Sequence, residues 1–366
     1  MAYKSIDEVQ EYLAKEVFGR TNDAKKASGR ALGTFIETIT YYLLKTWNLQ
    51  QLMSIETRLP EYGYPDLTHN VEFTLHKLQN LYTTSLDKNK TLTTLALSKQ
   101  LGLNKYHQFK SASSKKIYDH LEHSQKNCSV VGCDCNHQYI ANIDYKECKC
   151  LCSELELQAF AMFECKRVGK EGDAKGPQTI EKAKQGAYVA RTVSELQRVI
   201  GQDGKLHGLL NIDGDIVVDE YYNCIDRIIN GDLKRKIQNF ILTIGIVSNH
   251  GNWFTAENQN KELRVLNHSY DWLLFLSDDG LTSFIQAIFK FPACKEAFTH
   301  SYSLNQKTGK KNANCFTKSI ISVDADMELT CFFSKNIQEI ESWFNILTPH
   351  YTNLSELKIQ LNKLGE

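Results

Sequence analysis

The sequence has no long hydrophobic run. None of its apolar stretches approaches the roughly 20 residues that a helix needs to cross a bilayer. The N-terminal segment 1–10 also has no apolar stretch of the kind that forms the core of a signal peptide. With 366 residues, 42% of them hydrophobic, the chain can bury a sizeable core in two or three structural units. We therefore expect a soluble, cytoplasmic protein with no membrane partner.

The sequence also has no net charge. Its 43 basic and 43 acidic residues cancel, so no overall field would attract a polyanion such as DNA. Local basic clusters exist all the same, at Lys115–Lys116, Lys166–Lys170, Lys234–Lys236 and Lys310–Lys311. A nuclease needs a basic cleft, and the acidic residues of its metal site offset part of that charge. Each cluster taken singly fits a solvated surface equally well.

Evenly spaced cysteines, which are typical of a secreted disulfide-linked domain, are absent. Seven of the eleven cysteines lie within residues 128–165, and in a reducing cytosol such crowding favours metal over disulfides. A structural Zn²⁺ site is therefore one prediction. Its possible ligands are Cys128, Cys133, Cys135, His137, Cys148, Cys150 and Cys152. The spacing differs from the common C-x2-C pair, so reduced and partly buried thiols are the alternative.

The most informative segment is Leu157–Gly169, an apolar run that ends with Glu164 and Lys166 two residues apart. On a strand, residues i and i+2 point to the same face, so a carboxylate and an ammonium group would lie side by side. A carboxylate can hold a hard divalent cation. An amine can orient or deprotonate an attacking water, or neutralise charge on a phosphate. Cys165, between them, should point into the sheet as a core residue. The alternative interpretation is an ordinary salt bridge on an edge strand.

The segment downstream supports a phosphodiesterase. A glycine-containing polar loop, 170–178, precedes a predicted helix, 179–193, that carries Lys184 and Gln185. A cation and an amide on this helix could orient the phosphate backbone of a substrate.

Upstream, the periodicity predicts a long helix over 27–47 and a strand over 53–59. Glu37 lies in that helix among apolar neighbours, and its carboxylate either reaches solvent or turns toward a metal site. A turn-rich loop containing Asp66 then leads to an alternating strand beginning at Val71, with Glu72 on the polar side of that strand.

These pieces together resemble the PD-(D/E)XK nuclease superfamily, and particularly type II restriction endonucleases. The matching parts are Phe163-Glu164-Cys165-Lys166, the helix with Gln185-Gly-Ala-Tyr188, and the upstream helix with Gly33-Thr-Phe-Ile-Glu37. The resemblance implies an α/β (α+β) core, a central mixed sheet flanked by helices, and Mg²⁺ held by Glu164 and a second acidic residue. It also implies that Glu37 joins the metal network.

The sequence offers more than one candidate for the second acidic residue. Pro65-Asp66 resembles the first half of the superfamily motif, but Asp66 and Glu164 lie about a hundred residues apart, whereas the superfamily usually separates them by a few tens. Residues 78–155 must then be an insertion. Glu72 and Asp144 remain alternatives, and we prefer Asp66 or Glu72 because a helix and a strand precede them.

The insertion and the C-terminal region have their own patterns. Leu92–Phe109 has the helix, glycine turn and helix pattern of a helix-turn-helix. This pattern predicts either DNA contact or a helical hairpin without binding function. Buried strands are predicted at Phe240–Val247 and Tyr270–Leu276. The resulting division is 1–77 for the N-terminal helices and first strands of the nuclease core, 78–155 for the helical and cysteine-rich insertion, 156–290 for the rest of the core, and 291–366 for an α+β region.

The function implied by the resemblance is a prokaryotic, Mg²⁺-dependent endonuclease that cuts double-stranded DNA at a specific sequence. A homodimer and a companion DNA methyltransferase in the host follow from the same resemblance. One alternative is a repair or recombination nuclease that recognises DNA structure. Others are a non-catalytic, zinc-containing DNA-binding protein and a thiol-rich metal or redox sensor.

Overall fold

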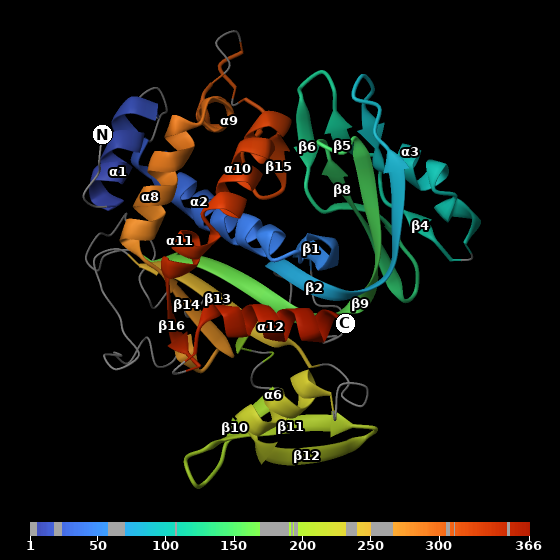
Figure 1. Cartoon of the computed structure of the whole chain (residues 1–366), viewed down its shortest axis with the longest axis vertical. Helices are drawn as coiled ribbons and strands as arrows, with labels where there is room; N and C mark the ends of the chain where they lie inside the picture. Colours follow the sequence, from blue (N-terminus) through green and yellow to red (C-terminus); the bar gives the residue numbers. More distant parts are fainter. Residues whose placement is uncertain are drawn as a thin grey trace.

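The computed structural model describes residues 6–17, 24–57, 70–106, 108–168, 190–191, 193, 197–231, 240–249, 266–304, 308–310, 312–349 and 352–366. Over this part of the chain, helices and strands combine in one molecule with a large central sheet (Figure 1).

The central sheet is mixed. Its strands are β1 (Met53–Thr57), β2 (Val71–Ser85), β4 (Lys110–Ser111), β7 (Ser129–Cys133), β8 (His137–Asp144), β9 (Lys149–Val168), β13 (Leu242–Asn249), β14 (Trp272–Leu276) and β16 (Phe344–Thr348). They follow the order β16-β14-β13-β9-β8-β7-β4, while β2 pairs with both β9 and β1. β13 runs parallel to β9 and β14, and the other pairs are antiparallel. The expected mixed sheet is therefore confirmed.

β9 is the longest strand in the described part of the chain, with 20 residues. Its first half pairs with β8, its second half pairs with β13, and β2 follows it along the other side. Both expected boundaries of the insertion, near residues 77 and 155, fall inside these continuous strands. The insertion and the core therefore share one sheet.

The described residues also form helices and helical turns. They are α1 (Ile6–Tyr12), the π-helical turn η1 (Leu13–Val17), α2 (Ala24–Thr46), the 3₁₀ turn η2 (Gln50–Leu52), α3 (Thr94–Gln100), α6 (Tyr221–Asn230), α8 (Asp278–Lys290), α9 (Pro292–Tyr302), α10 (Val323–Lys335), α11 (Ile337–Ser342) and α12 (Leu354–Gly365). The side chains of Ser277, Ser322 and Asn353 cap the N-termini of α8, α10 and α12 by accepting backbone hydrogen bonds.

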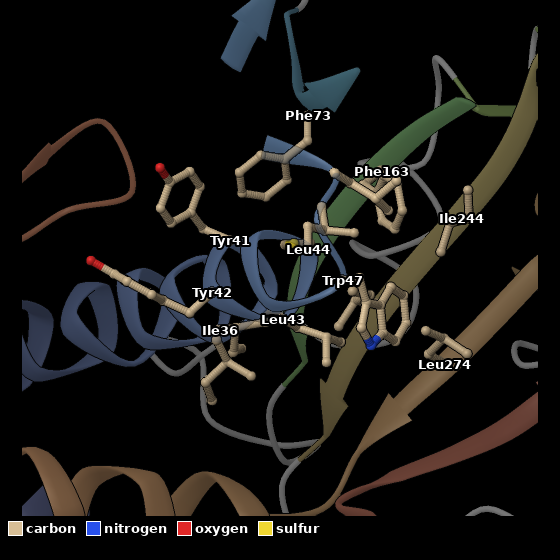
Figure 2. Packing of buried hydrophobic residues seen from close by; sticks show 14 of the residues in the cluster. Ile36, Tyr41, Tyr42, Leu43, Leu44, Trp47, Phe73, Phe163, Ile244 and Leu274 are labelled. Atoms are coloured by element: carbon tan, nitrogen blue, oxygen red, sulfur yellow. The ribbon is translucent and has the colours of Figure 1, made fainter. Parts of the chain in front are cut away.

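The main core lies between the sheet and α2, the long helix expected from the sequence. Tyr41, Leu44 and Trp47 of α2 lie against Phe73 of β2 and Phe163 of β9 (Figure 2). α2 is buried on several sides at once, because α8 and α10 pack on it from outside. Its position brings the middle of the helix, with Glu37, close to the end of β9.

A smaller core covers the opposite face of the sheet. Met162 of β9, Val247 of β13 and Phe275 of β14 contribute to it, together with Tyr270 from the segment before β14. Glu164 and Lys166 alternate with Cys165 along β9, so they lie on this second face while Cys165 lies toward α2.

The region over 78–155 is rich in strands rather than helical. β3 (Leu92–Thr93), β5 (Lys116–Asp119) and β6 (Ser124–Lys126) form a second sheet with β15 (Ile320–Ser322), in the order β15-β6-β5-β3. The expected helix-turn-helix is wrong in its second helix. After α3 and a left-handed Gly102, the described residues form only the 3₁₀ turn η4 (Leu103–Lys105) before β4, so they contain no recognition helix at this place.

A third, three-stranded sheet stands at one end of the molecule (Figure 1). It consists of β10 (Arg198–Ile200), β11 (Leu206–Ile212) and β12 (Asp215–Glu220), and α6 packs against it. Among the helices of the described residues, none has the length and apolarity needed to span a membrane.

Candidate active site

Three side chains predicted from the sequence meet where β2 begins and β9 ends. Lys166 Nζ lies 2.7 Å from Glu164 Oε2 and 3.1 Å from Glu72 Oε1. We call Glu72, Glu164 and Lys166 the Glu164 group. A single ammonium thus bridges two carboxylates from neighbouring strands.

Strand register explains why these residues meet. Phe73 of β2 faces Phe163 of β9, and Thr74 faces Met162. Continuing this antiparallel register by one residue places Glu72 opposite Glu164, on the same face of the sheet. Lys166 follows two residues later and shares that face.

The two carboxylates repel each other in a buried environment. Glu164 is 3% exposed, and its pKa is raised well above the usual value by burial and by the charge of Glu72. Burial would also raise the pKa of Glu72, but Lys166, a hydrogen bond with Glu164 and the charge of Lys318 together outweigh that effect and lower it. Without a further cation, Glu164 therefore holds its proton more tightly than an ordinary glutamate.

Lys166 remains an ammonium in this setting. Burial alone would lower its pKa, but Glu164 and Glu72 raise it above the usual value of a lysine. In this arrangement the amine is a fixed positive charge and cannot accept a proton at neutral pH.

Two buried polar atoms at this place have no hydrogen-bond partner. They are Oε2 of Glu72 and the hydroxyl of Tyr270. Tyr270 reaches the site because β13 carries Gly245 beside Glu164. A Cβ at that position would come within 2.7 Å of the tyrosine ring. Burial and the charges of Glu164 and Glu72 raise the pKa of the Tyr270 hydroxyl. Unpartnered buried polar atoms are uncommon in native proteins, so both call for a partner that the described side chains do not supply.

A second ion-pair group lies on the α2 side of the sheet, within electrostatic reach of Glu72. Lys318 Nζ lies 3.1 Å from Glu37 Oε2 and 3.4 Å from Glu56 Oε1. We call Glu37, Glu56 and Lys318 the Lys318 group. Burial raises the pKa of Glu37, Lys318 opposes that shift, and the charge of Glu72 adds to it, so the two groups are electrostatically coupled. Glu37 thus lies near the candidate site, paired with a lysine.

The other predicted metal ligands and substrate contacts are either outside the described residues or far from the Glu164 group. Asp66, Lys184 and Gln185 lie outside the described residues. Asp144 lies opposite Lys149 at the start of β9, whereas Glu164 lies near its end. At about 3.3 Å per residue, tens of ångströms of strand separate them. Asp144 is therefore wrong as a second ligand for a cation at Glu164.

The cysteines near residues 128–152 do not come together around a zinc position. Within the described ranges, the one group of three metal-type ligand atoms all within 4.8 Å is Asp134, His137 and Glu154, without sulfur. Strand pairing explains this result. Cys150 and Cys152 point from β9 into an apolar cluster, and burial raises the pKa of the Cys150 thiol to about 12. These thiols therefore pack as core residues.

The Asp134, His137 and Glu154 group is satisfied by the protein itself. His137 Nδ1 lies 3.2 Å from Asp134 Oδ1 and 3.6 Å from Glu154 Oε1. Tyr139 donates its hydroxyl hydrogen to either carboxylate, 3.0 Å from Asp134 and 3.1 Å from Glu154. Backbone amides hold the other oxygen of Asp134, and two side chains of β2 donate to the other oxygen of Glu154. Because every oxygen has a donor, we assign this group a structural role, in contrast to Glu72.

Sequence reasoning missed Glu56, Lys318 and Tyr270 as site residues. Lys318 stands alone in a polar segment about 150 residues after Lys166, with no local pattern around it. Tyr270 gave a signal only as the start of a buried strand. Pairing of β15 with β6 brings Lys318 to the site, and pairing of β14 with β13 and of β13 with β9 brings Tyr270 there. None of these pairings has a signature in a single sequence.

Comparison of the chain with models of protein families, with curated proteins and with solved structures finds no match.

Proposed function

We propose that this protein is a metal-dependent nuclease of the PD-(D/E)XK type that hydrolyses phosphodiester bonds in DNA. The observation that carries the proposal is the Glu164 group. Glu72, Glu164 and Lys166, all chosen from the sequence, meet at the β2–β9 junction with one carboxylate oxygen unpartnered.

The donor set fits a hard divalent cation such as Mg²⁺. Glu72 and Glu164 would hold it through carboxylate oxygens, the ligands that Mg²⁺ prefers, and the unpartnered Oε2 of Glu72 is available for this purpose. When bound, such a cation would polarise the phosphate and lower the pKa of a water molecule. It would also relieve the repulsion that raises the pKa of Glu164.

The residues of the chain itself then have distinct roles. Lys166 carries a fixed positive charge, so it stabilises negative charge that develops on the phosphate rather than removing a proton from water. Tyr270 has a hydroxyl without a partner near the same carboxylates, and it can donate to a phosphate oxygen or to the attacking water. Rigid strands hold both carboxylates, so little reorganisation is needed when charge develops.

The finer parts of the proposal come from the resemblance to type II restriction endonucleases. They are cleavage of double-stranded DNA at a specific sequence, a homodimeric state and a companion methyltransferase. The zinc-containing, non-catalytic alternative loses support, because the described cysteines do not assemble a metal site.

The test compares the wild type with Lys166→Ala on unmethylated phage or plasmid DNA, with Mg²⁺ and with EDTA. Lys149→Ala is the matched control, since Lys149 lies on the same strand but is exposed at its other end. We expect discrete fragments from the wild type and the control with Mg²⁺. We expect a rate lower by about 100-fold or more in Lys166→Ala, the usual effect of removing one electrostatic stabiliser.

Each result has a defined meaning. Intact DNA in every lane, with folded protein, would contradict the proposed nuclease. Cleavage of branched or mismatched DNA but not of intact duplex would replace the restriction enzyme by a structure-specific repair nuclease.

A further inference from the structure

Lys318 is a buried lysine that the proposed reaction does not use. It is 5% exposed, and it contacts two carboxylates beside the Glu164 group. Taking a charged amine out of water is costly, so a buried lysine persists only where carboxylates compensate it. The structure thus keeps a positive charge next to the candidate metal site.

The backbone around Lys318 is held in place by a distant segment. Asn127, just after β6, donates its side-chain amide hydrogen to the carbonyl of Lys318 at 3.0 Å. The backbone amide of Asn127 also donates to the carbonyl of Ser319 at 3.0 Å. The ammonium lies 5.7 Å from the centre of the Phe73 ring, next to Glu72 in sequence. The amine is therefore positioned before any ligand binds.

Glu56 supplies an independent indication that this place is specialised. It occupies the left-handed backbone region, with φ of 54°, inside strand β1. Residues other than glycine rarely adopt this conformation, and such strain is concentrated at functional sites. From this position the Oε1 atom of Glu56 lies 3.4 Å from Lys318 Nζ.

The charges of the two groups can be counted together. Glu37, Glu56, Glu72 and Glu164 face only Lys166 and Lys318 in the ion pairs of the described residues, which leaves a formal charge of −2 when all are ionised. One divalent cation would neutralise this charge, whereas two would leave an excess of positive charge beside the poorly exposed ammonium groups of Lys166 and Lys318.

We infer that the site holds one divalent cation per chain, between Glu72 and Glu164, and that the Lys318 ammonium replaces a second cation beside Glu37 and Glu56. This inference rests on the proposed function and deepens it. Glu37 then contributes to the site through Lys318 and is not a metal ligand, which modifies the role that the resemblance implies for it.

The test is a titration of the whole protein with Mn²⁺ alone, followed by electron paramagnetic resonance of the free ion, with circular dichroism to verify folding. The wild type should bind one ion per chain and Glu164→Gln none. Lys318→Met keeps the length of the side chain but removes its charge, so Glu37 and Glu56 become free to bind and two ions are expected. Lys45→Met is the matched control, because Lys45 also pairs with a poorly exposed carboxylate, that of Asp326, and it should still bind one ion.

A second variant keeps the test decisive if Lys318→Met does not fold. Glu37→Gln should still bind one ion with little change in affinity, since Glu37 is paired with Lys318. Two ions in the wild type, one ion in folded Lys318→Met, or loss of the ion in Glu37→Gln would each overturn the inference while leaving the proposed metal site intact. No bound ion in the wild type would instead contradict the metal-dependent function itself.

Discussion

His76 shows how one buried side chain couples the fold to pH. It lies on β2, is 2% exposed, and its Nε2 lies 2.7 Å from Thr74 Oγ1, while its Nδ1 has no hydrogen-bond partner. Burial lowers the pKa of His76 from 6.5 to about 4, so the folded protein keeps this imidazole neutral. The unfolded chain has no such constraint.

We predict that His76 makes the protein less stable in mild acid. Above pH 6.5 the imidazole is neutral in both the folded and the unfolded state, so its full contribution to the free energy of unfolding is present. Between pH 6.5 and 4 only the unfolded state gains the proton, so the free energy of unfolding falls, by about 3 kcal/mol at the low end. Urea unfolding of the wild type and His76→Leu over this range measures the effect. The variant should lose less stability toward pH 4, and parallel curves would contradict the prediction.

At the scale of secondary-structure elements, Asp271 links the third sheet to the central one. Its Oδ1 accepts hydrogen bonds from Arg198 Nη1 of β10 at 2.9 Å and from the hydroxyl of Tyr221 of α6 at 2.7 Å. Its Oδ2 accepts from the backbone amide of Thr243 of β13 at 2.8 Å. Asp271 and Arg198 are both buried. One carboxylate therefore joins three elements that are distant in sequence.

Asp271→Ala should lower the free energy of unfolding by about 3–5 kcal/mol. The reason is that the variant loses the buried ion pair with Arg198 and leaves the hydroxyl of Tyr221 and the backbone amide of Thr243 without their acceptor. Chemical denaturation measures the loss, and the exposed Asp215 of β12 offers the control Asp215→Ala, which should change stability little. If both variants are equally stable, the link between the sheets does not contribute as described.

At the scale of the whole molecule, a bound cation should stabilise the fold. An ion that binds only the folded state at a concentration of 100 times its Kd adds about 2.7 kcal/mol. We therefore expect the Tm of the wild type to rise by about 3–4 °C with Mn²⁺, because the entropy of unfolding of a 366-residue chain is about 0.8 kcal/mol/K. Differential scanning calorimetry with and without Mn²⁺ measures the change.

Two glutamates of the same strand provide the comparison. Glu164→Gln should abolish the Mn²⁺-dependent rise in Tm, because it removes a ligand. Glu154→Gln should retain it, because hydrogen-bond donors of the protein already satisfy Glu154. A rise that depends on Glu154 instead would move the metal site to the group with Asp134 and His137.

The sequence by itself determined the elements with strong periodicity. The apolar spacing over 27–47 predicted α2, and the apolar run at Leu157 predicted the strand that ends in Glu164 and Lys166. The spacing of Glu164 and Lys166 also fixed their shared face, because alternation along a strand is a local property. Local rules failed after Gly102, where a short polar segment carries too little signal to distinguish a helix from a turn.

Only the tertiary structure decided which distant residues meet. Antiparallel register selected Glu72 as the partner of Glu164 and excluded Asp144, which the sequence left open. Strand pairing across more than a hundred residues carried Lys318 to Glu37, and it spread the cysteines along strand faces instead of around a metal. These outcomes depend on non-local contacts, whose free energy comes from burial of the whole sheet, and no short segment of the chain encodes them.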